Sequence, residues 1–476
     1  MQLTDEQTAC IDFSTSSDRN LLISALAGAA KTTTLVELAK ANPGTEILCL
    51  AFNKKIAVEM QERLPSNCKA MTLNALGHRT WQEATGRRLK IDSGKTYTLV
   101  KTVIEEQTPS DQKVLYEQMT ELMQLVDFGK ACGYIPSGTY DKAKRLYGDD
   151  FFQHIEQELS PLEQDIIRDV TLRSLKLAFE GECDYNDQIL MPTIFHGAFP
   201  RYPLVLVDEA QDLSALNHAM LRKLARKRLI AVGDQCQAIY GFRGAHEDGM
   251  EKLRVDFDMT EMRLSTSFRC SRAVIRHAQW RAPHMRWPDW AIEGNVTTLD
   301  NWSASDIAES AAIICRNNAP LFGIAIRLLK NGRTCQLDGK DVITSITKVM
   351  RKFGGSDMRQ SAVFDKIDAW EERECGKNKK RAHARIRDRA ECMRIFAREG
   401  ATLADALAYA QHLMHLHSPL KLMTGHKSKG LEFDHVYFLD NDLVSDEDQD
   451  PNLRYVIQTR AKDTLTYINS KEFVDG

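Results

Sequence analysis

Short apolar runs that end abruptly in polar residues recur along the chain. Such runs open the segments 20–36, 47–64, 204–212 and 229–245. They are typical of buried parallel strands, and the carboxyl ends of parallel strands meet at one edge of a sheet. Ligands bind at that edge in α/β proteins. The pattern therefore predicts an α/β fold whose chemistry lies at the strand ends.

The segment 204–212 leaves its apolar run with four acidic or amide side chains, Asp208, Glu209, Gln211 and Asp212. Such a cluster is out of place in a core. It suits a nucleotide that carries Mg²⁺, together with an attacking water. The next apolar run, at 229–245, continues into Gln237 and places a further amide at a neighbouring strand end. These residues predict a hydrolytic site.

Residues 20–36 run from an apolar strand through small residues to Lys31, Thr32 and an amphipathic helix. In a phosphate-binding loop of this order, backbone N–H groups, a lysine and a hydroxyl hold phosphate and Mg²⁺. Ala25 and Ala30 occupy both positions that are usually glycine. Alanine at positive φ costs about 1–2 kcal/mol, so we expect ordinary dihedrals at both. Alone, the segment also suits a structural strand, turn and helix; the acids at 208–212 favour the nucleotide site.

Aromatic residues beside amides, hydroxyls and cations follow several of the predicted strands. Bases of single-stranded nucleic acid stack on aromatic rings, while the phosphates accept hydrogen bonds from N–H and O–H donors. Each such loop taken alone could equally be a solvated loop without a binding role. Two of them in series at the binding edge of the sheet favour contact with nucleic acid. The candidate contacts are Phe52, Asn53, Lys54, Thr72, Asn74, Tyr240, Phe242 and Arg243.

Composition sets wide limits on the class of protein. The chain has 476 residues and 43% hydrophobic content, which suffices for more than one domain. No apolar stretch reaches the length of a membrane span, and the N-terminal residues lack a signal-peptide pattern, so we expect a cytoplasmic protein without membrane contact. The eleven cysteines are scattered, and we expect reduced thiols. A net charge of -3 neither indicates nor excludes nucleic acid.

Charged, helix-forming sequence interrupts the strand pattern twice, which predicts two α/β domains with helical insertions. We predict a first domain at 1–84 and 190–262, a helical subdomain at 85–189, a second domain at 263–340 and 419–476, and a small charged helical insertion at 341–418. The run 377–389 holds seven basic residues and one acid. It suits either a solvated helix face or a nucleic-acid contact.

Basic and hydroxyl residues also stand at strand and helix ends of the second predicted domain. Arg269 follows an aromatic residue, Phe268, and Arg460 interrupts a strand-like run. An arginine supplied by a second domain can stabilise charge on a transferred phosphoryl group. Another apolar strand ends in Thr424, His426, Lys427 and Ser428, which are candidates for binding phosphate or for a relay between sites.

Nine segments occur in the order that is found in one helicase family. They are LTDEQ, ALAGAAKT, AFNKKIAVEM, TLNALG, LVDEAQD, VGDQCQAIYGFRGA, SFRCS, TGHKSKGLEF and YVIQTRAK. In these segments the chain resembles the UvrD/Rep family of superfamily 1 DNA helicases, from residue 3 to about residue 468. The resemblance implies two RecA-like P-loop domains with ATP in the cleft between them and single-stranded DNA across their tops. It also implies movement from 3′ to 5′.

The resemblance assigns roles to individual residues. Gln7 and Phe268 would contact adenine and Glu432 the ribose. The phosphates would be held by Gly28, Ala29, Ala30, Lys31, Thr32 and Thr33, and Mg²⁺ by Thr32 and Asp208. Glu209 would polarise the attacking water, Gln237 would sense the γ-phosphate, and Arg269 and Arg460 would reach that phosphate from the second domain. The DNA-contacting set would be Phe52, Asn53, Lys54, Thr72, Asn74, Tyr240, Phe242, Arg243, Thr424 and His426.

The chain departs from the family pattern in several places. Beyond the two alanines, Asn74 replaces the usual histidine and Phe268 the usual tyrosine. The interval from Arg269 to Thr424 is too short for the large insertion domain, which indicates a compact form. We expect single-stranded DNA or a tailed duplex as substrate and replication or repair proteins as partners. A translocase that strips proteins from single strands, and a scaffold that does not hydrolyse ATP, remain as alternatives.

Overall fold

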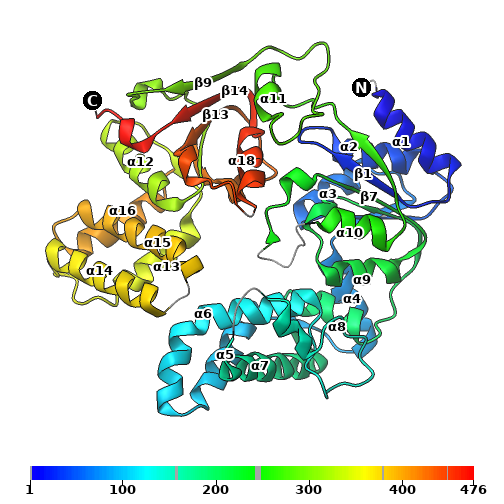
Figure 1. Ribbon diagram of the computed structural model, residues 1–476, viewed down its shortest axis with the longest axis horizontal. Helices are drawn as coiled ribbons and strands as arrows, with labels where there is room; N and C mark the ends of the chain where they lie inside the picture. The colour runs from blue at the N-terminus through cyan, green and yellow to red at the C-terminus, as the bar shows by residue number, and fades with distance from the viewer. Residues whose placement is uncertain (1–2, 156–158, 242–247, 378–379, 448, 476) are drawn as a thin grey trace. The chain divides into compact units, whose positions relative to one another are not determined.

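The computed structural model describes residues 3–155, 159–241, 248–377, 380–447 and 449–475. The chain divides into two compact units, Met1–Ser265 (unit 1) and Thr266–Gly476 (unit 2). In Figure 1 the colour runs from blue to green through unit 1 and from green to red through unit 2. Each unit has its own sheet with helices around it.

Unit 1 is built on a six-stranded sheet in which every neighbouring pair is parallel. The strand order is β3 (Cys68–Met71), β2 (Ile47–Leu50), β6 (Tyr202–Val207), β7 (Ala225–Gly233), β1 (Leu21–Ala25) and β8 (Thr260–Leu264). The four apolar runs of the sequence form β1, β2, β6 and the second half of β7, and nearly all of their residues are buried. A strand with helices on both faces of its sheet has no solvent-facing side, so consecutive residues can all be apolar.

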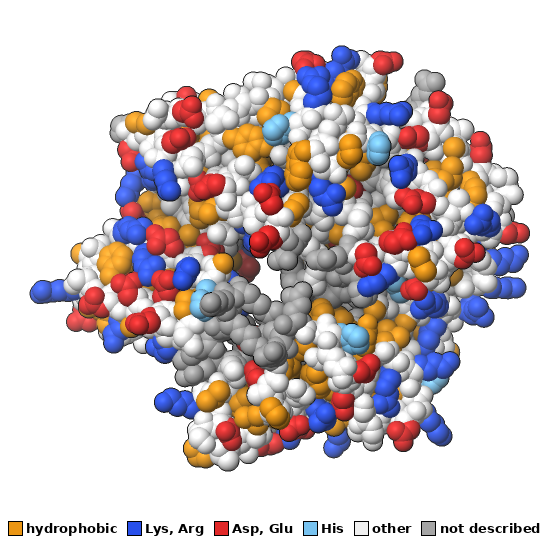
Figure 2. Space-filling view, viewed as in Figure 1, with side chains coloured by type: hydrophobic (Ala, Val, Ile, Leu, Met, Phe, Trp, Pro, Cys, Tyr) orange, Lys and Arg blue, Asp and Glu red, His pale blue; other side chains and the backbone are white. Residues whose placement is uncertain are grey.

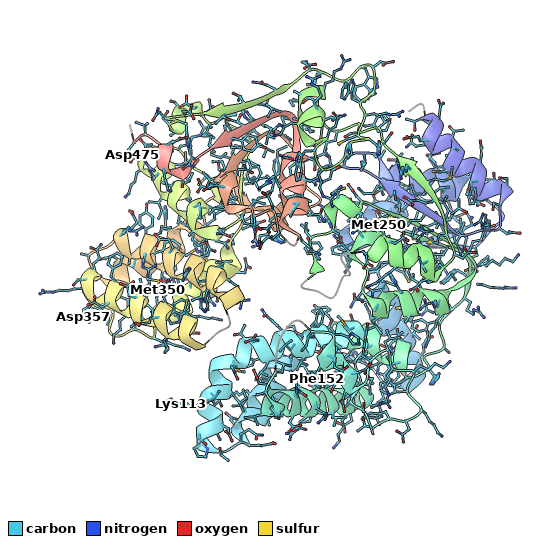
Figure 3. The ribbon with its side chains drawn as sticks, viewed as in Figure 1. Lys113, Phe152, Met250, Met350, Asp357 and Asp475 are labelled. Carbon is cyan, nitrogen blue, oxygen red and sulfur yellow. The ribbon has the colours of Figure 1, made fainter. Side chains whose placement is uncertain are left out.

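Side chains that alternate along β1 enter two different cores. Leu21, Ile23 and Ala25 pack with α1 (Asp5–Ser16), α2 (Lys31–Lys40) and α3 (Lys54–Arg63). Leu22 packs in a second core, on the other face of the sheet, with α4 (Leu73–Thr85), α9 (Ala215–Leu224) and α10 (Gly249–Asp256). Met250 of α10, which is labelled in Figure 3, belongs to this second core. Period-two alternation therefore joins the sheet to helices on both faces.

A helical subdomain lies between α4 and β6 in the chain. Its elements are β4 (Lys90–Ile91), α5 (Lys95–Glu105), α6 (Pro109–Cys132), η1 (Asp149–Gln153), α7 (Pro161–Glu180), β5 (Glu182–Cys183) and α8 (Asp187–Ile194). Proline at the first turn and a threonine or serine cap begin α6 and α7, as local sequence rules predict. The subdomain has an apolar core of its own, against which Phe152 packs (Figure 3).

Four buried charges fix the end of this subdomain. Lys95 Nζ lies 2.6 Å from Asp187 Oδ2, and Lys130 Nζ lies 2.6 Å from Asp187 Oδ1 and 2.5 Å from Asp184 Oδ2. Burial alone would lower the pKa of Lys130, but the carboxylates of Asp187 and Asp184 outweigh it and raise that pKa. The network holds the short segment 184–187 in place, because each charge depends on its partners in this low-dielectric site.

Unit 2 contains a second six-stranded parallel sheet. The order is β11 (Gln336–Leu337), β12 (Lys421–Thr424), β10 (Ala312–Cys315), β13 (Phe433–Leu439), β14 (Ala461–Ile468) and β9 (Asn295–Leu299). The connecting helices include α11 (Arg272–Ala278), α12 (Asn318–Lys330), α17 (Gly425–Ser428) and α18 (Asp450–Gln458). The predicted fold class is confirmed: two parallel sheets flanked by helices, as expected of two RecA-like domains.

The charged segment before β12 forms helices that share the core of the second sheet. These are α13 (Lys340–Met350), α14 (Gln360–Lys377), α15 (Lys380–Arg398) and α16 (Leu403–Met414). Met350, labelled in Figure 3, and Phe396 belong to the same buried cluster as Ile313 of β10 and Leu422 of β12. No helix in the described parts of the chain has the length and apolar character that crossing a bilayer requires.

Candidate functional site

A tight turn joins β1 to α2 and carries the predicted phosphate loop. Ala25 is the last residue of β1, Gly28 has a φ of 73°, and Ala30 has φ 54° and ψ 41°. The expectation of ordinary dihedrals is therefore wrong for Ala30. Ala30 is the N-cap residue of α2, where the chain reverses out of the turn into the helix. The residues predicted to hold phosphate lie together in this turn and the first turn of α2: Gly28, Ala29, Ala30, Lys31, Thr32 and Thr33.

Asp208 lies at the carboxyl end of β6, directly beside the start of α2. Its Oδ2 accepts a hydrogen bond from Thr32 Oγ1 at 3.1 Å. Burial, followed by the neighbouring charge of Glu209, raises the pKa of Asp208 to about 7, although Lys31 and Thr32 act in the opposite direction. A carboxylate and a hydroxyl are the hard oxygen ligands that Mg²⁺ prefers, and crowded carboxylates gain from a cation. Thr32 and Asp208 therefore fit a Mg²⁺ site.

A chain of hydrogen bonds links the carboxyl ends of β6 and β7. Gln211 is fully buried; its Nε2 donates to Glu209 Oε2 at 2.5 Å, and its Oε1 accepts from the Asp234 amide at 2.9 Å. Asp234 Oδ2 in turn accepts from Gln237 Nε2 at 2.6 Å. Glu209 has a left-handed backbone, with φ 53°, and strain of this kind clusters at functional sites. The structure thus brings Glu209 and Gln237 into one network.

Gln211 and Asp234 connect this network. The sequence placed Gln211 in the acid and amide cluster at 208–212 without a separate role, and it assigned no site role to Asp234. Burial raises the pKa of Asp234, while the charge of Lys31 and the bond from Gln237 lower it. For Asp234 the only signal in the sequence was that it follows a predicted strand. Their contact depends on β6 and β7 being neighbours in the sheet, which the strand pattern does not specify.

Gln7 connects the first helix to the phosphate loop. Its Nε2 donates to Thr34 Oγ1 at 2.9 Å, and Thr34 Oγ1 donates to the carbonyl of Ala30 at 3.1 Å. The Oε1 of Gln7 accepts from the Thr4 amide and completes the capping box of α1. The residue predicted to contact adenine is therefore buried and held next to the phosphate loop.

Phe52 and Tyr240 form an aromatic pair at the same edge of the sheet. Their ring centroids lie 5.8 Å apart with an interplanar angle of 10°, and Phe52 is 42% exposed. Asn53 and Thr72 cap α3 and α4 through their side chains, and Lys54 is exposed. Phe242 and Arg243 lie outside the described residues. An exposed, stacked ring beside a lysine can receive a nucleobase and its phosphate.

Tyr185 is a further candidate that sequence reasoning missed. Asn74 Nδ2 donates to the Tyr185 carbonyl at 2.7 Å and to Gln188 Oε1 at 3.1 Å. Tyr185 is 61% exposed and lies between Asp184 and Asp187, the two acids of the buried charge network. Its segment is 111 residues away from Asn74 in the chain, so spacing could not reveal the pair.

In unit 2, the structure brings Arg269 and Glu432 together. Arg269 Nε donates to Glu432 Oε2 at 2.8 Å, and its Nη1 donates to the Thr459 carbonyl at 3.3 Å. Phe268, the preceding residue, stacks on Trp290 with centroids 6.4 Å apart. Trp290 is 68% exposed and was not predicted as a site residue. These groups supply a guanidinium, a carboxylate and aromatic faces on one part of unit 2.

Arg460 is held by backbone carbonyls at the start of β14. Its side chain is almost completely buried; Nε donates to the Val456 carbonyl at 3.0 Å and Nη1 to the Leu431 carbonyl at 3.0 Å. The Leu431 carbonyl immediately precedes Glu432, so Arg460 also fixes the strand end that carries this acid. Arg269 and Arg460 therefore share one neighbourhood within unit 2.

Thr424 is the last residue of β12, and His426 lies two positions further along the chain. Thr424 is buried and forms the N-cap of the short helix α17, and His426 is half-buried. Figure 2 shows acidic and basic side chains interspersed over the face that it presents, in keeping with the net charge of -3.

Comparison with known proteins identifies the family. A model of the UvrD/REP helicase N-terminal domain matches residues 3–258, and a model of the UvrD-like helicase C-terminal domain matches residues 419–468. The chain is 24% identical to F-box DNA helicase protein 1 of Schizosaccharomyces pombe, over 99% of the chain and 58% of that protein. It is 25% identical to DNA helicase II of Escherichia coli K12, over 57% of the chain and 40% of that protein. It is 26% identical to DNA helicase IV of the same organism, over 51% of the chain and 43% of that protein.

The chain thus spans 58% or less of the length of these three relatives. The N-terminal match alone covers more than half of the chain and includes the phosphate loop, Asp208 and Glu209. The predicted resemblance is confirmed, and the chain belongs to the UvrD/REP family of superfamily 1 helicases, of which it is a compact member.

Proposed function

We propose that this chain is an ATP-dependent DNA helicase or translocase that moves along single-stranded DNA from 3′ to 5′. The network at the carboxyl ends of β6 and β7 carries this proposal. It places Asp208 beside Thr32 and links Glu209, through Gln211 and Asp234, to Gln237. Acids and amides arranged in this way next to a phosphate loop suit hydrolysis of a nucleoside triphosphate.

Each residue of unit 1 then has a definite task. The amides of the turn and of the α2 N-terminus bind the phosphates of ATP, and Lys31 adds a positive charge. Mg²⁺, held by Thr32 and Asp208, would supply further charge to stabilise those phosphates. Glu209 orients the attacking water and accepts its proton, while Gln211 holds the Glu209 carboxylate in position. Gln7 lies against the loop and contacts the adenine.

In unit 2, we assign Arg269 and Arg460 to the charge that develops on the transferred phosphoryl group, as arginines do in related ATPases. Phe268 offers a stacking face to the adenine and Glu432 an acceptor to the ribose. The bond between Arg269 and Glu432 keeps the guanidinium in a defined orientation. Loss of the γ-phosphate removes the group that the two arginines pair with. The ATP-bound and ADP-bound protein therefore differ in their preferred conformation.

The segment after β7 couples ATP to the DNA strand. Gln237 belongs to the hydrolytic network, and three residues later Tyr240 stacks on Phe52. A shift of Gln237 between nucleotide states therefore changes the position of an aromatic ring that holds a base. Tyr185 and Asn74 extend this DNA-binding surface on unit 1. Stacking contributes about 1–3 kcal/mol per base, which suffices to hold a strand between steps.

A second candidate function is translocation along single strands with little duplex unwinding. The helices α13 to α16 share the core of the second sheet instead of forming a large separate domain. If a large domain supplies duplex contacts in longer family members, a compact chain unwinds less well. Displacement of a labelled strand from duplexes with 3′ or 5′ tails separates the two activities and measures the polarity.

The deciding experiment is the ATPase rate with and without single-stranded DNA. We expect stimulation by DNA in the wild type, and in Glu209→Gln we expect loss of turnover with ATP binding retained. Glu37→Gln is the matched control, because Glu37 pairs only with Lys40 on the surface of α2 among the ion pairs described. A wild type without DNA stimulation would count against the proposed function. Normal turnover in Glu209→Gln would remove the role assigned to that residue.

A further inference from the structure

Lys427 of α17 forms ion pairs with two acids that open the neighbouring helical segment. Its Nζ lies 2.6 Å from Asp341 Oδ1 and 3.9 Å from Asp338 Oδ1. Asp341 is in the first turn of α13, and Asp338 follows β11. No role in the hydrolytic network or in the aromatic contacts requires this arrangement.

The position of Lys427 follows from the strand register. β11 pairs in parallel with β12, with Leu337 opposite Leu422, so the residues that follow both strands emerge at the same sheet edge. Lys427 comes three residues after Thr424 and directly after His426, two predicted DNA contacts. A lysine ammonium at this point has the chemistry to bind a backbone phosphate.

The ion pairs are weak enough to be exchanged. The side chain of Lys427 is 32% exposed, and those of Asp341 and Asp338 are 71% and 54% exposed. Exposed pairs of this kind add little to stability, because solvent screens both charges. Burial alone would raise the pKa of Asp341, but the Lys427 ammonium outweighs it and lowers that pKa, so the acid stays charged. A phosphate can therefore displace the carboxylates at little cost.

We propose that Lys427 is a further phosphate-binding residue for the DNA strand and that Asp338 and Asp341 compete with the phosphate for its ammonium. This inference rests on the proposed function. Two acids facing one lysine leave a net negative charge when the strand is absent, so they reduce the affinity of this contact. A motor gains from such a contact, because each phosphate must be released before the next step.

The test is the binding of a fluorescent oligo(dT) strand, measured by anisotropy over a series of KCl concentrations. We expect Asp341→Asn to bind about three-fold to five-fold more tightly at low salt, the size of one screened charge pair. Lys427→Gln should bind more weakly, and the slope of log affinity against log salt should become shallower by about 0.7, the value for one phosphate contact on a single strand.

The double variant decides whether Asp341 acts through Lys427. We expect Asp341→Asn to lose its effect in the Lys427→Gln background and Lys427→Arg to retain the wild-type salt slope. Asp357→Asn is the matched control, because Asp357 is an exposed acid of the same segment, labelled at its outer end in Figure 3. Equal tightening by Asp341→Asn in both backgrounds, or an unchanged slope in Lys427→Gln, overturns the inference. A wild type that fails to bind oligo(dT) instead overturns the proposed function.

Discussion

Two alanines stand where the phosphate-loop pattern has glycine, and the structure gives them opposite roles. Ala30 has a left-handed backbone, whereas Ala25 is the last residue of a buried parallel strand. A non-glycine residue in the left-handed region costs about 1–2 kcal/mol. We therefore predict that glycine stabilises unit 1 at position 30 and destabilises it at position 25.

The magnitudes follow from the two environments. Ala30→Gly removes the strain of about 1–2 kcal/mol but gives the unfolded chain more freedom, worth about 0.4–1 kcal/mol. The net gain in the free energy of unfolding is about 0–1.6 kcal/mol. Ala25 is 1% exposed in the core of α1, α2 and α3. Ala25→Gly should lower the free energy of unfolding by about 0.8 kcal/mol because a buried methyl group is removed. It should lower that free energy further, by about 0.5–1 kcal/mol, because glycine gives the unfolded backbone more freedom.

The assay must report on unit 1 alone, because a chain of two units need not unfold in one step. Cys10 and Cys49 are fully buried in the core beside the phosphate loop. Burial, together with the nearby charge of Glu6, raises the pKa of the Cys10 thiol to about 12, so it is unreactive while unit 1 is folded. Pulsed alkylation across a urea series, read by peptide mass spectrometry, gives the unfolding midpoint of this core.

Opposite shifts of the two midpoints are the expected result. Destabilisation of similar size in both variants would refute the reasoning, because it would mean that Ala30 is not strained by its left-handed backbone. The pair also separates strain from packing. Both substitutions remove the same methyl group, and the two positions differ in backbone conformation and burial.

Two further predictions concern the helical subdomain and the DNA surface. Asp187→Ala should destabilise unit 1 by about 3–5 kcal/mol, because it leaves Lys95 and Lys130 buried without their shared carboxylate. Alkylation of Cys183 over a urea series measures the loss of stability. A loss no larger than that caused by Asp165→Ala, which changes an exposed acid, would contradict the prediction. Phe52→Ala should weaken binding of oligo(dT) by about 5-fold to 150-fold, because a base loses its stacking partner. Val58→Ala, which changes an exposed side chain, should leave this binding unchanged. Equal effects of the two substitutions in an anisotropy titration would argue against a base-stacking role for Phe52.

Much of the site could be predicted because it lies at strand ends. Apolar runs revealed β1, β2, β6 and β7, and the rule that ligands bind at the carboxyl edge grouped Lys31, Thr32 and Asp208. The hydrogen bond between Thr32 and Asp208 joins residues 176 positions apart. The bond itself was not predicted, but the resemblance assigned both residues to one Mg²⁺, and the strand-end rule places both at the same edge of a parallel sheet.

Other features depend on which elements are neighbours. The bond between Gln211 and Asp234 requires β6 beside β7, and the contact between Asn74 and Tyr185 requires the helical subdomain to return to α4. The pairing of Lys427 with Asp341 requires β11 beside β12. Hydrophobic periodicity reports the faces of each element but not the order of strands in a sheet, so none of these contacts could be predicted.

Local sequence therefore determined the fold class, the strand, turn and helix that we propose bind phosphate, the acidic strand end and the family. The tertiary structure alone decided the left-handed conformation of Ala30, the exposed ring of Tyr185 and the acids that face Lys427. The physical reason is the range of the interactions. Strand and helix preferences act over a few residues, whereas backbone strain, long-range hydrogen bonds and ion pairs arise only when packing brings distant segments together.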